Sequence, residues 1–233
     1  NPFLEWNGNV WIACSPAAKA ATILYTFGLS LRLMVIPYPL THDYYPFHIQ
    51  LQSFSNTFVL FSLLIMLSMI AYATWSMLRK KKAGFGIIFF LVPISITSNL
   101  FFPIGAFLAE RFLYLPSLGL LMAFVFWGSS LAGKKNSGSV NYLIASILIV
   151  FSFMTVMRNF AWKDNATLLR TDIRHSPNSA KGQNDLGTIF LEEALKTQDS
   201  IQQKVLFLEA YPHLLRALEL HPTYFDAYLA TGA

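Results

Sequence analysis

The sequence contains little cysteine and little charge. Cys14 is the only cysteine among 233 residues, which excludes an intrachain disulfide and any metal cluster built from several cysteines. Charged residues make up 12% of the chain and hydrophobic residues 55%, whereas soluble domains carry about 25% charged residues. The composition therefore excludes an ordinary soluble domain and predicts a multi-pass membrane protein whose soluble part is small.

The common signatures of soluble enzymes are also missing. The sequence has no Walker A loop, no dinucleotide-binding fingerprint, no His-Glu-x-x-His and no Gly-x-Ser-x-Gly. Its five histidines are scattered through a loop and the tail, so no metal site is expected. The net charge is +5, but the clustered lysines lie beside apolar runs. They therefore report membrane topology and do not indicate nucleic-acid binding.

Apolar stretches account for most of residues 1–157, which we expect to form a multi-pass transmembrane domain. The stretches are residues 17–40, 57–78, 85–108, 115–132 and 140–157. The first stretch carries Lys19 and Arg32, so it is either a span with snorkelling ends or a helix lying in the membrane interface. The third contains two prolines, and from about Asn99 we expect a re-entrant or interfacial segment.

Two basic loops predict the orientation of the spans. Arg79 to Lys82 and Lys134-Lys135 are separated by two apolar stretches, so they lie on one side, which the positive-inside rule makes cytoplasmic. By parity, the loop at 41–56, the Glu110-Arg111 loop and everything after Arg158 lie on the extracytoplasmic side.

Glu110 and Arg111 stand between two long runs that contain no charge. Charged groups are costly near hydrocarbon, so such a pair favours a functional interpretation. The alternative is that the pair lies in a short hydrated loop and only fixes its shape. Asp43, with His42 and Tyr44, lies on the same side by parity. It can line the same site, or it can simply cap a turn.

Residues 158–233 have a different composition and fit the tetratricopeptide pattern, in which small residues allow two helices to cross closely. The matching residues are Leu186, Gly187, Phe190, Ala210, Leu214, Ala217 and Pro222. An insertion of about 11 residues relative to the repeat period is expected near 197–203. Since about three repeats are needed for a stable stack, and since the chain begins at Asn1, we expect a piece of a longer protein. The alternative is an ordinary helical hairpin without repeats.

A polytopic domain followed directly by such repeats resembles the family of transmembrane and tetratricopeptide-repeat-containing (TMTC) proteins and their bacterial relatives. The stretches that carry the resemblance are Leu31 to Leu33, Pro39 to Tyr44, Thr97 to Leu100, Ala109 to Gly119, Arg158-Asn159 with Trp162, Ser179 to Lys181 and Leu186-Gly187. The resemblance implies an all-α GT-C fold, with the membrane domain as its C-terminal half and the tail as the start of a repeat solenoid. It also implies a catalytic carboxylate in a first outer loop, which would precede Asn1.

The function implied by the resemblance is transfer of a sugar, expected to be mannose, from a polyprenyl- or dolichyl-phosphate donor to Ser or Thr of a protein. The repeats would bind the polypeptide acceptor. Candidates for binding the donor phosphate or sugar are Arg111, Glu110, Asp43, His42 and Tyr44; Glu110 can alternatively orient Arg111. Beyond the lipid-linked donor no cofactor is expected. The location is a bacterial inner membrane or the endoplasmic reticulum membrane. The alternative function is a non-enzymatic, membrane-anchored repeat scaffold for protein partners.

Overall fold

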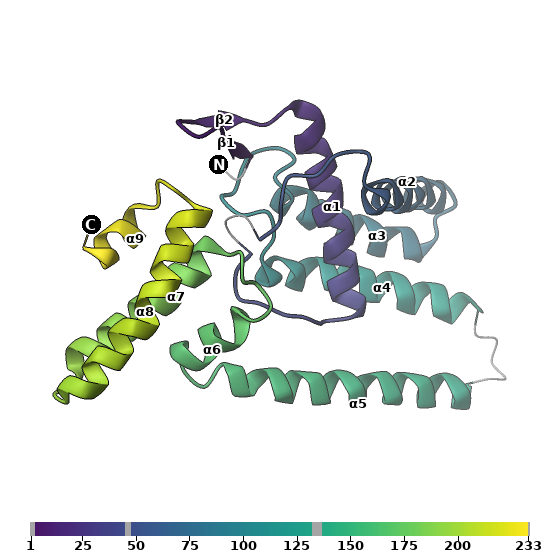
Figure 1. Ribbon diagram of the computed structural model, residues 1–233. Helices are drawn as coiled ribbons and strands as arrows, with labels where there is room; N and C mark the ends of the chain where they lie inside the picture. Colours follow the sequence, from purple (N-terminus) through teal and green to yellow (C-terminus); the bar gives the residue numbers. More distant parts are fainter. Residues whose placement is uncertain (1–2, 45–47, 132–136, 233) are drawn as a thin grey trace.

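The computed structural model of the protein describes residues 3–44, 48–131 and 137–232, and it is almost entirely helical (Figure 1). This confirms the all-α prediction. The helices of the apolar part are α1 (Pro16–Val35), α2 (Thr57–Leu78), α3 (Lys82–Thr97), α4 (Tyr114–Leu131) and α5 (Ser137–Ala161). Those of the tail are α6 (Asn165–Asp172), α7 (Ala180–Lys196), α8 (Ser200–Leu220) and α9 (Phe225–Thr231). Among the described residues, four segments are long and apolar enough to cross a membrane: Pro16–Val35, Thr57–Leu78, Glu110–Gly128 and Ile144–Ala161.

A short β-hairpin, which was not expected from the sequence, precedes α1. Strands β1 (Leu4–Trp6) and β2 (Trp11–Ala13) pair in antiparallel register. The indole N–H of Trp11 donates a hydrogen bond of 2.8 Å to the hydroxyl of Thr223, just before α9. The hairpin therefore links the N-terminal region to the far end of the tail.

Helices α3 and α4 pack closely because glycines lie at their crossing. A Cβ atom on Gly86 would collide with the backbone of Ala123, and one on Gly119 would collide with the backbone of Phe90. Small residues at a helix–helix interface allow this approach, which is a common way for helices to associate inside a membrane.

Helix α1 runs crosswise to α4 and α5 (Figure 1). Its buried side contacts only parts of its neighbours: Ala21 and Leu24 pack on Val59 near the start of α2, and Phe27 packs on Phe90 and Ile94 in the second half of α3. The cluster around Phe27 also includes Met66 and Met69 in the middle of α2. Helix α1 therefore packs against the first part and the middle of α2 and the second half of α3.

The stretch from 98 to 109 is an irregular segment organised by Asn99. Helix α3 ends at Thr97, and Asn99 then adopts a positive φ of 61°, a conformation that Asn tolerates better than most residues. Its buried amide donates to the carbonyl of Ala106 at 2.7 Å and accepts from the N–H of Ile104 at 2.8 Å. The segment ends just before Glu110, where a 3₁₀ turn (Glu110–Leu113) begins and leads into α4.

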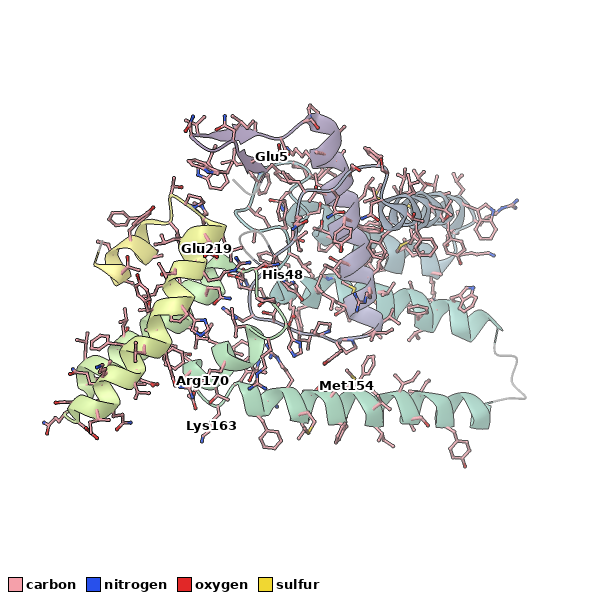
Figure 2. The ribbon with its side chains drawn as sticks, viewed as in Figure 1. Glu5, His48, Met154, Lys163, Arg170 and Glu219 are labelled. Atoms are coloured by element: carbon pink, nitrogen blue, oxygen red, sulfur yellow. The ribbon has the colours of Figure 1, made fainter. Side chains whose placement is uncertain are left out.

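Helix α5 is exposed along most of its described length, as expected for an apolar helix that faces lipid. It ends at a corner with α6 that carries Lys163 and Arg170 (Figure 2). From this corner onward the chain is polar, and the described tail packs beside the irregular loops of the membrane domain (Figure 1).

In the tail, α7 and α8 form an antiparallel hairpin whose interface contains the residues of the repeat pattern. Leu186, Phe190 and Ala210 form one buried cluster, and a Cβ atom on Gly187 would lie 2.7 Å from Cγ of Leu214. The insertion expected near 197–203 was wrongly placed, because only residues 197–199 connect the two helices. The extra residues instead lengthen α7 and α8.

Candidate functional site

The loop Thr41-His42-Asp43-Tyr44, hereafter the 41–44 loop, is held by side chains from three other parts of the chain. The first is Glu110 at the start of the 3₁₀ turn. One of its carboxylate oxygens accepts hydrogen bonds from the backbone N–H of Thr41 at 2.6 Å and from the hydroxyl of Tyr44 at 3.1 Å. Glu110 thus fixes both ends of the 41–44 loop.

The second contact comes from Asp172, the last residue of α6. Its side chain is 1% exposed and accepts from both terminal nitrogens of Arg158 in a bidentate pair. The same carboxylate accepts the backbone N–H of His42 at 2.6 Å and lies 3.1 Å from Nδ1 of its ring. Asp172 therefore joins the end of α5, α6 and the 41–44 loop.

The third contact comes from the start of α7 and the turn before it. Lys181 Nζ donates to the carboxylate of Asp43 at 2.9 Å, and Asp43 is 6% exposed. The hydroxyls of Thr41 and Ser176 lie 3.1 Å apart. Every residue of the 41–44 loop is thus bonded to another region, which positions the first repeat helix against the membrane domain.

The pKa values of three groups around this loop are shifted. Burial raises the pKa of Glu110, against the hydrogen bonds from Thr41 and Tyr44 that lower it. Burial alone would raise the pKa of Asp172, but hydrogen bonds from His42 and Arg158, together with the Arg158 charge, lower it to about 2. Burial and the nearby Glu110 charge raise the pKa of Tyr44. Asp172 is therefore ionised at neutral pH and Tyr44 is protonated, so that Tyr44 is a hydrogen-bond donor to Glu110.

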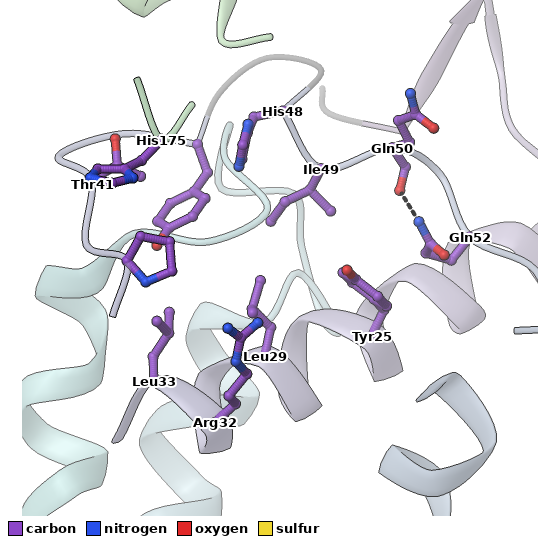
Figure 3. Close-up of a pocket in the computed structure, with 12 residues that line it drawn as sticks. Tyr25, Leu29, Arg32, Leu33, Thr41, His48, Ile49, Gln50, Gln52 and His175 are labelled. Atoms are coloured by element: carbon purple, nitrogen blue, oxygen red, sulfur yellow. Dashed lines mark hydrogen bonds between the residues drawn. The ribbon is translucent and has the colours of Figure 1, made fainter. Parts of the chain in front are cut away.

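The 41–44 loop separates two hollows of different character. Thr41 and Tyr44 line a cavity of about 300 Å³ against α1, together with Arg32, His48 and other residues (Figure 3). His42 lines a larger groove of about 730 Å³ between α6, α7 and α9. We call these the basic cavity and the acidic groove.

The acidic groove combines carboxylates with an apolar floor. Asp185 and Asp226 line it beside Asn184, and burial raises the pKa of Asp185. Asn184 is 6% exposed, and its side-chain oxygen has no hydrogen-bond partner. The apolar lining residues are Leu168, Leu169, Ile189 and Leu229. Such a surface is suited to an extended chain with polar backbone groups and mixed side chains.

The predicted site residues fall into two groups. Glu110, His42, Asp43 and Tyr44 meet around the 41–44 loop. Arg111 is exposed, and its guanidinium lies 5.1 Å from the ring centre of Phe112. Within the described residues it forms no ion pair with Glu110, which contradicts the idea that Glu110 orients Arg111; the neighbouring carboxylate is occupied by the 41–44 loop. The alternative that Asp43 only caps a turn is incomplete, because its carboxylate binds Lys181.

Residues that the sequence did not assign to a site also belong here: Asp172, Arg158, Lys181 and Arg32. Arg158 and Lys181 lie in stretches that carry the family resemblance, but only the fold places them beside residues 41–44. Across residues 3–44, 48–131 and 137–232, no three His, Cys, Asp or Glu side chains are grouped so as to hold a metal ion.

Comparison with known proteins shows relatives of one kind. The chain is 29% identical over 206 residues, 84% of its length, to human protein O-mannosyl-transferase TMTC1, and 28% identical over 203 residues to mouse protein O-mannosyl-transferase TMTC4. It is 32% identical over 117 residues, 48% of its length, to protein O-mannosyl-transferase tmtc2 of Xenopus laevis. These matches confirm the resemblance to the TMTC proteins.

The chain spans about a quarter of the length of the first two relatives, 23% and 27%, and a smaller part of the third, 13%. No family model matches the chain, and no solved structure matches it.

Proposed function

Since the chain is TMTC-like in sequence, we propose that it belongs to a membrane O-mannosyltransferase and contributes the meeting point of donor and acceptor. The observation that carries this proposal is the 41–44 loop, which forms a common wall between the basic cavity and the acidic groove. A group-transfer enzyme must bring its two substrates into contact, and the 41–44 loop contributes lining residues to both hollows, Thr41 and Tyr44 to one and His42 to the other.

The acceptor in this proposal is an extended polypeptide carrying Ser or Thr. It would lie in the acidic groove, with Asn184 hydrogen-bonding its backbone and with Asp185 and Asp226 favouring basic side chains. Tetratricopeptide stacks use such concave surfaces for binding. At the end of the groove, His42 is held through Nδ1 by Asp172, which leaves its other ring nitrogen to bind the acceptor hydroxyl.

The donor in this proposal is a sugar on a polyprenyl phosphate, and mannose is the sugar in the names of the relatives. Transfer breaks the bond between C1 of the sugar and the phosphate oxygen and forms a bond from C1 to the acceptor oxygen. A base takes the hydroxyl proton, and the lipid phosphate leaves with the negative charge. Arg111, exposed beside the 41–44 loop's anchor Glu110, is available to meet donor groups at this face.

The proposed side of the membrane for this chemistry is extracytoplasmic. The basic turn at Arg79 to Lys82 joins α2 and α3 at the end of the molecule opposite the tail (Figure 1). The positive-inside rule places that turn in the cytoplasm. The 41–44 loop and the repeats then lie together across the membrane.

The test is mannosyl transfer by the protein expressed from its native gene. Membranes containing it are given polyprenyl-phosphate mannose and a Ser/Thr peptide, and labelled peptide is counted. We expect transfer by the natural protein and at least a tenfold loss in His42→Ala. The control Lys204→Gln changes an exposed residue of α8 and should leave transfer unchanged. Peptide binding without any transfer would instead support the scaffold alternative.

A further inference from the structure

The basic cavity is lined by Arg32, which forms no ion pair with a carboxylate among the described residues. It lies between one face of α1 and residues 39–44 and 48–52, with His175 at its side (Figure 3). None of the described residues that line it is acidic. Arg32 lines it, and within the described residues Arg32 has no hydrogen bond or ion pair. An arginine in this setting is available for an anion from outside the chain.

The two carboxylates that contact the 41–44 loop from outside the cavity lining already have other partners. Glu110 accepts from Thr41 and Tyr44. Asp172 is engaged by Arg158 and His42. The charge of Arg32 is therefore compensated only by solvent or by a ligand.

Neutral donors converge on the same space. Tyr25 lines the cavity, its ring lies edge-on to Phe58, and its hydroxyl has no described partner. His48 also lines it, and its Nδ1 is buried without a hydrogen-bond partner. Burial lowers the pKa of His48, so its ring is neutral near pH 7 and offers one N–H. Guanidinium, phenol and imidazole donors around one hollow match the oxygens of a phosphate.

Part of the remaining lining is apolar, and the rest includes the polar residues Thr41, Gln50 and Gln52. Leu29 and Leu33 of α1 line the cavity together with Ile49. Elsewhere α1 packs on α2 and on the second half of α3, so the cavity adjoins the packed membrane helices. A volume of about 300 Å³ is at the lower limit of small-molecule sites. It suits a headgroup, with the rest of the ligand outside.

We propose that this cavity binds the phosphate of a polyprenyl-phosphate lipid, with Arg32 as the principal phosphate ligand and Tyr25 and His48 as hydrogen-bond donors. This inference rests on the proposed function for the identity of the lipid. It assigns the phosphate to Arg32 in preference to Arg111, which lines neither the cavity nor the groove.

The experiment measures equilibrium binding of radiolabelled polyprenyl monophosphate to the purified protein in detergent. We expect saturable binding of the lipid phosphate and none of the corresponding polyprenol. Arg32→Gln should weaken binding at least tenfold and Arg32→Lys by less, because lysine keeps the charge but loses the bidentate geometry. Arg79→Gln, a matched change at an exposed arginine at the far end of α2, should have no effect. Size-exclusion profiles and unfolding temperatures matching the natural protein show that the variants are folded.

Several outcomes would overturn the inference. Equal binding by Arg32→Gln and Arg79→Gln would remove Arg32 from the site, as would a loss confined to Arg111→Gln. Displacement of the lipid by inorganic phosphate at equal concentration would show a site for free phosphate. The result is also separable from the proposed function: binding that depends on Arg32 without mannosyl transfer would refute only the enzyme, and transfer with Arg32-independent binding would refute only this site.

Discussion

Replacing Asp172 by alanine should release the 41–44 loop, because this carboxylate joins three segments. The pKa of Asp172 is about 2 against an ordinary 3.8, so native contacts favour its charged form by roughly 2–3 kcal/mol at about 1.4 kcal/mol per pKa unit. Removing one partner of a buried ion pair typically costs about 3–5 kcal/mol, since the other charge is left uncompensated. The middle of the smaller range already corresponds to an increase of about 60-fold in the open population of the loop.

The assay is hydrogen exchange at the backbone N–H of His42, which donates to Asp172 at 2.6 Å. When opening is fast relative to exchange, the exchange rate reports the open population. We expect Asp172→Ala to accelerate exchange of this amide by about 60-fold or more. The double variant Arg158→Met with Asp172→Leu should be less affected, because no unpaired buried charge remains.

A matched control is Glu219→Gln, which removes the carboxylate of an exposed pair with Arg216. Exposed pairs contribute about 0–1 kcal/mol, so exchange at His42 should be unchanged. The reasoning would be refuted if Asp172→Ala left the His42 amide protected, or if Glu219→Gln exposed it to the same degree.

Three further predictions concern pH and packing. Because the folded pKa of Asp172 is depressed, its contribution to the stability of the closed 41–44 loop is complete above about pH 4 and is lost as the pH falls toward 2. Hydrogen exchange at the His42 amide, corrected for its intrinsic pH dependence, should therefore accelerate over that range, and a flat profile would contradict this. Gly187→Val should lower stability by about 1–3 kcal/mol through collision with Leu214, seen as a lower unfolding temperature of the tail; an unchanged temperature would count against the α7–α8 interface. Gly119→Ala should lower thermal stability by forcing α3 and α4 apart. On the same helix, the Cβ atom added by Gly128→Ala meets open space, so this variant should be neutral or stabilising. Equal thermal stability of the two variants would disprove the close crossing.

Much of the fold was predictable because a membrane helix can be recognised from the hydropathy of its own residues. Thr57–Leu78 was expected as a span on hydropathy alone and is a helix with those ends. A re-entrant or interfacial segment was expected from about Asn99; the helix does end just before it, at Thr97, and the placement of the segment relative to the membrane stays a prediction. The position of the extra residues in the tail, relative to the repeat period, was in contrast not predictable from local sequence, because it depends on tertiary packing. Apolar residues that continue along α7 and α8 extended both helices, so the connecting turn stayed short.

The candidate site was predictable only in part, because its contacts join residues far apart in the sequence. His42 and Asp43 could be placed near Glu110 by counting spans, but nothing in the sequence pairs His42 with Asp172, 130 positions away. From the sequence, Arg32 could be interpreted only as a snorkelling or interfacial residue; the fold shows that it lines a cavity whose described lining contains no carboxylate. The adjacency of Glu110 and Arg111 was misleading as a guide to pairing, since Glu110 is turned toward the 41–44 loop.

The central claim is that the repeat tail is docked on the 41–44 loop, on one side of the membrane. Its most direct test is thiol cross-linking in intact membranes, with Asp43→Cys and Lys181→Cys introduced into a Cys14→Ser background. The two native side chains are 2.9 Å apart, so a short cross-linker should join the cysteines efficiently, while a pair at Lys81 and Lys181 should remain unlinked. Failure of the first pair to link, or linking of the second, would contradict the account.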